Sequence, residues 1–113
     1  MRNAPPACER VVTNEPTTAA DLAALAEDRR PFLVDVREDD EWAAGSIPGA
    51  RHIALGELVA RADEIPRDCR VVLYCRAGTR SAHAVAALAR LGYDNVHNLE
   101  GGIEAWRAQE PGH

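Results

Sequence analysis

Residues 71–91 read VVLYCRAGTRSAHAVAALARL, and this stretch decides the fold. Its first part, Val71 to Tyr74, is apolar and rich in β-branched residues, which predicts a buried strand. The polar loop Cys75–Ser81 follows it. From residue 80 onward, apolar residues recur on one helix face, at Ala84, Val85, Leu88 and Leu91. Gly92 is a typical helix stop, so the stretch predicts a strand, a short loop and a helix over 80–91.

The same alternation continues on both sides of this stretch. Further strands are expected over 32–36, 51–54 and 95–99. Further helices are expected over 18–28, 39–44, 55–64 and 102–107. The first of these begins with a capping box formed by Thr18 and Asp21. Strands that alternate with short helices predict an α/β domain with a mainly parallel sheet.

Length and composition indicate one domain. The chain has 113 residues, and we expect residues 11–110 to fold together, with a flexible tail over 1–10 and a short tail over 111–113. The 13 basic and 18 acidic residues leave a net charge of −5, which argues against nucleic acid as a partner. No apolar run approaches the ~20 residues of a membrane span, and residues 1–10 lack the apolar core of a signal peptide. The expected location is therefore the cytoplasm, away from membranes.

The cysteines are Cys8, Cys69 and Cys75. An odd number without a secretion signal does not indicate a disulfide framework, and no spacing indicates a metal site. Cys69 and Cys75 should lie at opposite ends of one strand, so Cys69 is a poor resolving cysteine. Cys8 lies on the expected tail. The remaining question is whether one cysteine is a reactive thiol.

Cys75 has the surroundings that activate a thiol. Ligands of parallel sheets bind beyond the carboxyl ends of strands, a rule that points to Val36-Arg37 and to Tyr74-Cys75. Gly78 allows the loop to curl, so that backbone N–H groups of the loop and the first helical turn face inward. Arg76 and Arg80 add positive charge at the rim. Such an environment lowers a cysteine pKa from about 8.5, so we expect a thiolate at neutral pH.

Two simpler interpretations compete with this one. A cysteine at a strand end is often only a small buried apolar residue. The loop could also bind phosphate without cysteine chemistry, but the chain has no lysine and no Walker or dinucleotide glycine pattern.

The sequence resembles the single-domain rhodaneses, or thiosulfate sulfurtransferases, over residues 11–108. Four motifs carry the resemblance in the family's order: Leu33–Arg37 with Glu41-Trp42, Gly45–Ala50, Val72–Ser81, and Leu99–Ile103 with Ala105-Trp106. Ser46 departs from the family's usual histidine, which bears on the packing of that turn.

The resemblance implies a three-layer α/β fold, with a five-stranded, mainly parallel sheet and helices on both faces. It also implies that Cys75 takes a sulfur atom from a small anionic donor such as thiosulfate and passes it, as a persulfide, to a thiophilic acceptor. That acceptor is a protein thiol or a small thiol, and no cofactor or metal is needed. The residues expected to hold the donor and the persulfide follow Cys75 directly: Arg76, Ala77, Gly78, Thr79, Arg80 and Ser81.

Other functions remain open at this point. A protein-to-protein sulfur relay and a non-catalytic binding or sensing module both suit the same loop. Phosphatase or arsenate reductase activity is disfavoured, because only four residues separate Cys75 from Arg80, whereas related cell-cycle phosphatases place five there.

Further charged residues lie near the presumed site. Asp35 and Arg37 lie at the end of the 32–36 strand, and we interpret them as structural support of the site rather than as catalytic groups. The acidic run from Glu38 to Glu41 is interpreted as a solvated helix start.

Overall fold

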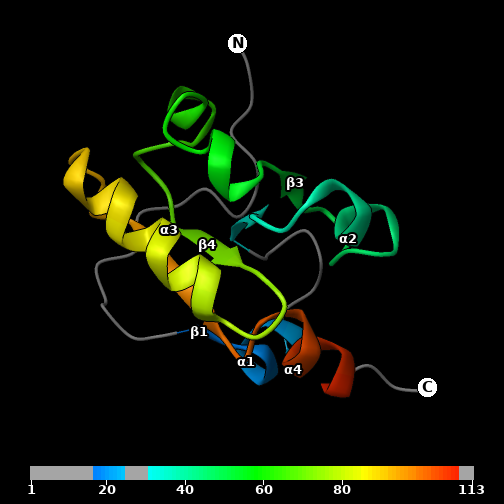
Figure 1. Ribbon diagram of the computed structural model, residues 1–113. Coiled ribbons are helices and arrows are strands. Elements are labelled where there is room, and N and C mark those ends of the chain that lie inside the picture. The colour runs from blue at the N-terminus through cyan, green and yellow to red at the C-terminus, as the bar shows by residue number, and fades with distance from the viewer. Residues whose placement is uncertain (1–16, 25–30, 110–113) are drawn as a thin grey trace, which may run out of the picture.

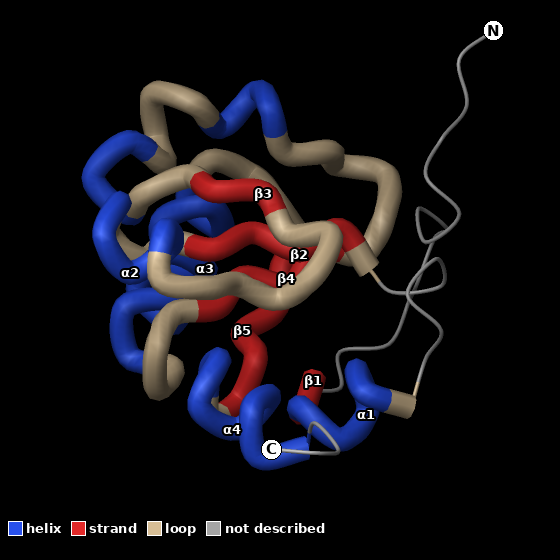
Figure 2. Tube along the Cα trace, turned by 90° about the vertical axis from the view of Figure 1, so that its right-hand side faces the viewer, coloured by secondary structure: helices blue, strands red, loops and turns tan. Residues whose placement is uncertain are grey.

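A parallel sheet forms the centre of the molecule in a computed structural model that describes residues 17–24 and 31–109. Its strands are β1 (Thr17–Thr18), β2 (Phe32–Asp35), β3 (Arg51–His52), β4 (Val71–Tyr74) and β5 (Val96–Glu100). The strand order is β1-β5-β4-β2-β3 (Figure 2). Every neighbouring pair is parallel. The five-stranded parallel sheet is thus confirmed, although β1 joins it over two residues only and β2 to β5 form its main body.

Helices cover both faces of this sheet (Figure 1). They are α1 (Ala19–Ala23), α2 (Asp39–Ala43), α3 (Thr79–Arg90) and α4 (Gly102–Gln109), with two 3-10 turns, η2 (Leu55–Glu57) and η3 (Ala62–Glu64). The helix α3 and the two 3-10 turns bury apolar side chains against one face. The helices α1 and α4 and the 45–50 turn do so against the other. The expected three-layer architecture is confirmed.

Local chemistry explains where the elements begin. All four residues of β4 are buried, which accounts for its unbroken apolar sequence. The capping box of α1 is present: Thr18 Oγ1 accepts from the Asp21 N–H at 3.1 Å, and the Asp21 carboxylate accepts from the Thr18 N–H at 3.4 Å. The part of the expected helix beyond residue 24, both expected tails and Cys8 lie outside the described residues.

The helix expected over 55–64 is wrong, because η2 and η3 take its place. A glycine in the first turn, Gly56, disfavours a regular helix. Three residues per turn then place Leu55 and Leu58 on the same side. Leu58 is buried, whereas the neighbouring Val59 is 61% exposed.

Within 17–24 and 31–109, none of the helices combines the length and the apolar character needed to cross a bilayer.

Candidate active site

Cys75 lies directly beyond the carboxyl end of β4, where the chain curls into the first turn of α3. Its Sγ accepts hydrogen bonds from the N–H of Gly78 at 3.1 Å and from the N–H of Ser81 at 3.4 Å. The Ser81 hydroxyl oxygen also lies 3.4 Å from this sulfur. Cys75 is 1% exposed, so the sulfur lies on the floor of a cradle of backbone donors.

Gly78 gives the loop its curl. Its φ of +110° lies in the left-handed region that side chains disfavour, and it is the N-cap of α3. This conformation turns the N–H of Gly78 toward Sγ while its carbonyl accepts from Ala82 N–H at 3.2 Å. Gly78 therefore joins the cradle to the helix.

The cradle lowers the pKa of the Cys75 thiol below its ordinary value of 9.0. Burial alone acts in the opposite direction and raises this pKa. Hydrogen bonds from the hydroxyl and N–H of Ser81, and from the N–H groups of Gly78 and Ala77, outweigh burial because they stabilise the anion. The thiolate is therefore more populated than that of a free cysteine at the same pH.

The two rim arginines are both paired with carboxylates, which the sequence did not reveal. Arg80 makes a two-pronged ion pair with Glu41 of α2, with N–O distances of 2.7 and 2.9 Å. Arg76 Nε lies 3.5 Å from a carboxylate oxygen of Glu104 on α4, and both of these side chains are exposed. The rim of the loop is consequently closer to neutral than two unpaired arginines would make it.

The pairing between Arg80 and Glu41 shifts the pKa of both groups. The pKa of Glu41 is lowered from 4.5 to about 2. The hydrogen bonds from Arg80 are the largest cause, and the hydrogen bond from the Glu38 N–H is the next largest. The Glu41 hydrogen bonds raise the pKa of Arg80, and the charge of Cys75 contributes in the same direction. Arg80 thus still acts on the sulfur electrostatically.

Asp35 and Arg37 form a buried ion pair at the end of β2. The two side chains are 0% and 4% exposed, and Arg37 Nη2 lies 2.7 Å from the Asp35 carboxylate. The same nitrogen donates to the Gly45 carbonyl at 2.6 Å. Nearby, the N–H of Ile47 donates to the Tyr74 hydroxyl at 3.1 Å. The ion pair therefore ties the end of β2 to Gly45, and Tyr74 of β4 holds Ile47 of the same turn.

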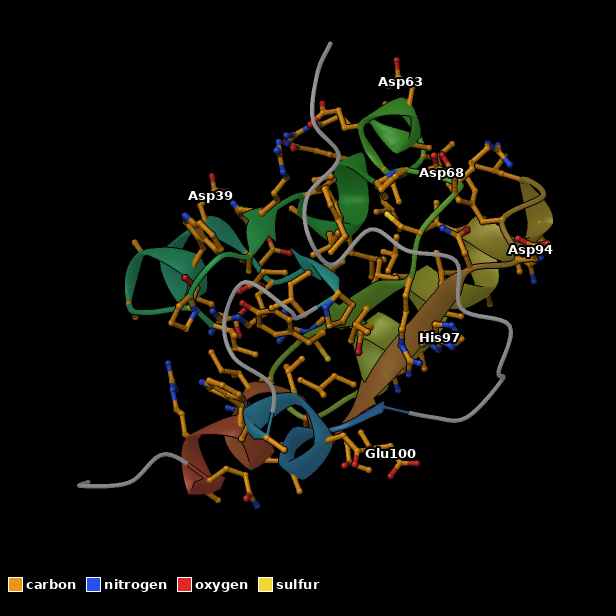
Figure 3. The ribbon with its side chains drawn as sticks, turned by 180° about the vertical axis from the view of Figure 1, so that it is seen from behind. Asp39, Asp63, Asp68, Asp94, His97 and Glu100 are labelled. Atoms are coloured by element: carbon orange, nitrogen blue, oxygen red, sulfur yellow. The ribbon has the colours of Figure 1, made fainter. Side chains whose placement is uncertain are left out.

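The acidic run after Arg37 begins α2, as expected. Its first turn is closed by the N–H of Glu38, which donates to the Glu41 carboxylate at 3.0 Å. Asp39 projects outward with a 96% exposed side chain (Figure 3). Only Glu41 departs from the interpretation of a solvated run, because it also binds Arg80.

Sequence reasoning missed the contribution of α4 to the loop. The N–H groups of Ile103 and Glu104 donate to the carbonyls of Cys75 and Arg76 at 2.9 and 3.1 Å. A Cβ on Gly102 would overlap both of these carbonyl oxygens. Figure 1 shows the loop between β4 and α3 reaching the start of α4. The pair Gly101-Gly102 was the available signal, since a glycine can mark a close backbone approach.

Sequence reasoning also missed Asn98 of β5. Its Oδ1 lies 2.5 Å from the Ser81 hydroxyl, and its Nδ2 donates to the Gly78 carbonyl at 3.3 Å. A single asparagine in a strand gives no sequence signal for this role.

Cys69 lies away from Cys75, and among the described residues the acidic and histidine side chains do not gather into a metal site. Cys69 is buried and precedes β4, at the opposite end of the strand from Cys75. Among the residues in 17–24 and 31–109, no three His, Cys, Asp or Glu side chains gather as a metal site would require. Figure 3 shows Asp39, Asp63 and Asp94 at separate edges of the molecule.

The chain was compared with known proteins. The family model of the Rhodanese-like domain matches residues 18–109. A sulfurtransferase of Allochromatium vinosum is 46% identical over 82 residues, which is 73% of this chain and 77% of that protein. The thiosulfate sulfurtransferase GlpE of Pseudomonas entomophila is 35% identical, covering 71% and 73%. A crystal structure of a rhodanese-related protein from Thermoplasma volcanium is 35% identical and superposes with a TM-score of 0.74, covering 83% of this chain and 91% of that one.

Proposed function

The chain belongs to the rhodanese-like domain family, and from this premise we propose that it is an enzyme that moves a sulfane sulfur from thiosulfate or a related donor to a thiophilic acceptor. The observation that carries the proposal is the position of Cys75 Sγ in a cradle of N–H donors that lowers the thiol pKa. The relative named a thiosulfate sulfurtransferase supports thiosulfate as the donor.

The first step loads the enzyme. The Cys75 thiolate attacks the outer sulfur of thiosulfate and forms a new S–S bond. The donor's own S–S bond breaks, and its electron pair leaves with the sulfonate group as sulfite. The product is a Cys75 persulfide anion, and the total charge of −3 on thiolate plus thiosulfate equals that on persulfide plus sulfite.

The second step unloads it. A thiolate of a small thiol or of a protein attacks the outer sulfur of the persulfide. The S–S bond to Cys75 breaks and its electrons return to Cys75 Sγ as the thiolate. Neither step requires a separate general base or a cofactor.

The loop residues have distinct parts in this proposal. The N–H groups of the 76–81 segment stabilise the negative charge of the Cys75 thiolate. After loading, they stabilise the negative charge of the persulfide in the same way. Arg76 is the more available guanidinium for an anionic donor, since its contact with Glu104 is long and exposed. Arg80, held by Glu41, contributes its positive charge from a fixed position. Ala77 and Thr79 are exposed on the loop, where the donor enters.

The test is intact-protein mass spectrometry after incubation with thiosulfate, with Cys75→Ser as the matched variant. We expect the wild type to gain one sulfur atom and to lose it to cyanide as thiocyanate, while the folded variant gains none. Circular dichroism checks that the variant is folded. An equal gain of sulfur by the variant, or no gain by the wild type, would contradict the proposed mechanism.

A further inference from the structure

The Ser81 hydroxyl lies between two acceptors but has a single proton. Its oxygen is 2.5 Å from Asn98 Oδ1 and 3.4 Å from Cys75 Sγ. A hydroxyl can donate only one hydrogen bond at a time. Ser81 is 0% exposed, so the proton stays within this small group of protein atoms. Asn98 and Cys75 therefore compete for it.

The orientation of the Asn98 amide decides which acceptor holds the proton. The Gly78 carbonyl can only accept, so the amide group 3.3 Å from it must be the donating Nδ2. Asn98 Oδ1 then faces Ser81, and an amide oxygen can only accept. The short contact between them thus requires the Ser81 hydroxyl to donate to Asn98, and the serine oxygen turns a lone pair toward Sγ.

This arrangement suits a thiol better than a thiolate. A thiol S–H can donate weakly to the serine oxygen, whereas a thiolate has no proton to donate and needs the hydroxyl to turn toward it. We propose that Asn98 is a positioning residue that holds the Ser81 hydroxyl proton while Cys75 is a thiol and gives it up to Sγ when the sulfur becomes an anion. The thiol proton leaves to solvent, and the hydroxyl rotates without breaking a covalent bond.

The cradle accordingly has a constant part and a conditional part. The backbone N–H groups of Gly78 and Ser81 point at the sulfur in either state. The Ser81 hydroxyl serves the sulfur only when the anion attracts it more strongly than Asn98 does. This deepens the proposed function, on which it rests for the use of the thiolate as nucleophile.

The charged groups near the loop are the same in the leucine, alanine and double variants used below. They are the ion pairs Arg80–Glu41, from α3 and α2, and Arg76–Glu104, from the loop and α4. The pair Asp35–Arg37 lies at the end of β2. His97, the neighbour of Asn98 on β5, points to the opposite face of the sheet because side chains alternate along a strand.

The experiment measures the rate of alkylation of Cys75 by iodoacetamide against pH, read by mass spectrometry on the peptide that contains this residue. The proteins are the wild type, Asn98→Leu, Ser81→Ala and the double variant. Asn98→Leu frees the hydroxyl for the sulfur, so the midpoint of the profile should move lower by about one pH unit, the effect of one hydrogen bond to a charged group. Ser81→Ala alone should raise the midpoint by much less than about one pH unit, because the wild-type hydroxyl must leave Asn98 before it can serve the sulfur. The double variant should return to the midpoint of Ser81→Ala.

The proposal is contradicted if the two substitutions change the midpoint of the pH profile independently of each other. If Ser81→Ala raises the midpoint equally with and without Asn98→Leu, the hydroxyl donates to the sulfur regardless of Asn98 and the proposal is wrong. An unchanged midpoint in folded Asn98→Leu overturns it as well. The Gly78 carbonyl keeps its bond from Ala82 in these variants, which preserves the loop.

A second variant covers the case in which Asn98→Leu does not fold. Asn98→Asp keeps an acceptor toward Ser81 and adds negative charge, so its midpoint should move higher. A purely structural role of Asn98 predicts shifts in the same direction for the leucine and aspartate variants. Should only Ser81→Ala fold, a midpoint raised by about one pH unit in that protein would overturn the proposal.

Alkylation requires no sulfur donor, so the two proposals fail separately. If the effects of Ser81 and Asn98 on the midpoint are coupled but thiosulfate does not load the protein, only the proposed function is refuted. Normal loading with additive effects would refute the role of Asn98 alone.

Discussion

At the scale of single residues, the backbone donors around Cys75 were predictable and the carboxylate partners of the two loop arginines were not. A cysteine, a glycine and two arginines between a strand and a helix predict an activated thiol from local sequence alone. The partner of Arg80 is Glu41, 39 residues earlier, and no local pattern links the two. In the sequence, nothing distinguishes Glu41 from the other acidic residues of the 38–41 run. The fold places Glu41, and not its neighbours, against Arg80.

The ion pair between Glu41 and Arg80 should contribute to stability in a pH-dependent way. Glu41 has a folded-state pKa of about 2 against an ordinary 4.5. A lowered pKa stabilises the fold above pH 4.5, and this contribution is lost as the pH falls from 4.5 toward 2. We expect Glu41→Gln to lower the free energy of unfolding by about 1 kcal/mol at pH 7.

Urea unfolding of the wild type and Glu41→Gln at pH 7 and pH 3 measures this contribution. The difference between the two proteins should shrink at pH 3. The control is Glu57→Gln, which removes an exposed partner of Arg61 and should change little. A Glu41→Gln effect that is the same at both pH values would show that the ion pair is not its source.

At the scale of elements, the β4–loop–α3 unit follows from its own sequence, but the loop also depends on α4. Periodicity predicts α4 as a helix and says nothing of what its first N–H groups contact. These groups bind the carbonyls of Cys75 and Arg76. Holding both carbonyls outward leaves the following N–H groups of the loop to face the sulfur.

Gly102 should therefore be sensitive to a single methyl group. In Gly102→Ala the new Cβ meets two carbonyl oxygens, so α4 must move away from the loop. We expect a loss of about 1–3 kcal/mol in the free energy of unfolding, typical of overpacking, together with slower sulfur loading of Cys75. Thermal unfolding and the mass-spectrometric loading assay measure the two effects.

Gly56→Ala is the matched control for this change. Nothing lies within 4 Å of a Cβ at Gly56, so the variant should be neutral or slightly stabilising and load normally. Equal behaviour of the two alanine variants would mean that the contact between α4 and the loop is unimportant.

At the scale of the whole molecule, the parallel sheet brings distant segments to one edge. The strands β2 and β4 are neighbours, so Asp35 and Tyr74 lie side by side in register. The 45–47 turn contacts both strand ends. The Gly45 carbonyl accepts a hydrogen bond from Arg37, and the Ile47 N–H donates one to the Tyr74 hydroxyl. The fold class and the location of the candidate site could be predicted from the sequence, because strand ends in a parallel sheet converge. The contacts across that edge did not, since they join residues that are far apart in the chain.

Asp35→Asn tests whether the buried ion pair supports the structure or takes part in the reaction. The change leaves the Arg37 charge buried without its partner, and we expect a loss of about 3–5 kcal/mol in the free energy of unfolding. Urea unfolding measures it, with the exposed Asp39→Asn as a control that should change little. A stable Asp35→Asn protein that no longer loads sulfur would instead assign the pair to the reaction.

The contact between α4 and the loop also has a consequence in time. A ribosome adds residues in the order of the chain, so Cys75 leaves it before Asn98, Gly102 and the N–H groups of Ile103 and Glu104 exist. Until those residues arrive, the carbonyls of Cys75 and Arg76 lack the partners that orient the loop. The cradle around Cys75 is therefore complete only after α4, the last helix of the domain, has been made, although the loop itself emerges earlier.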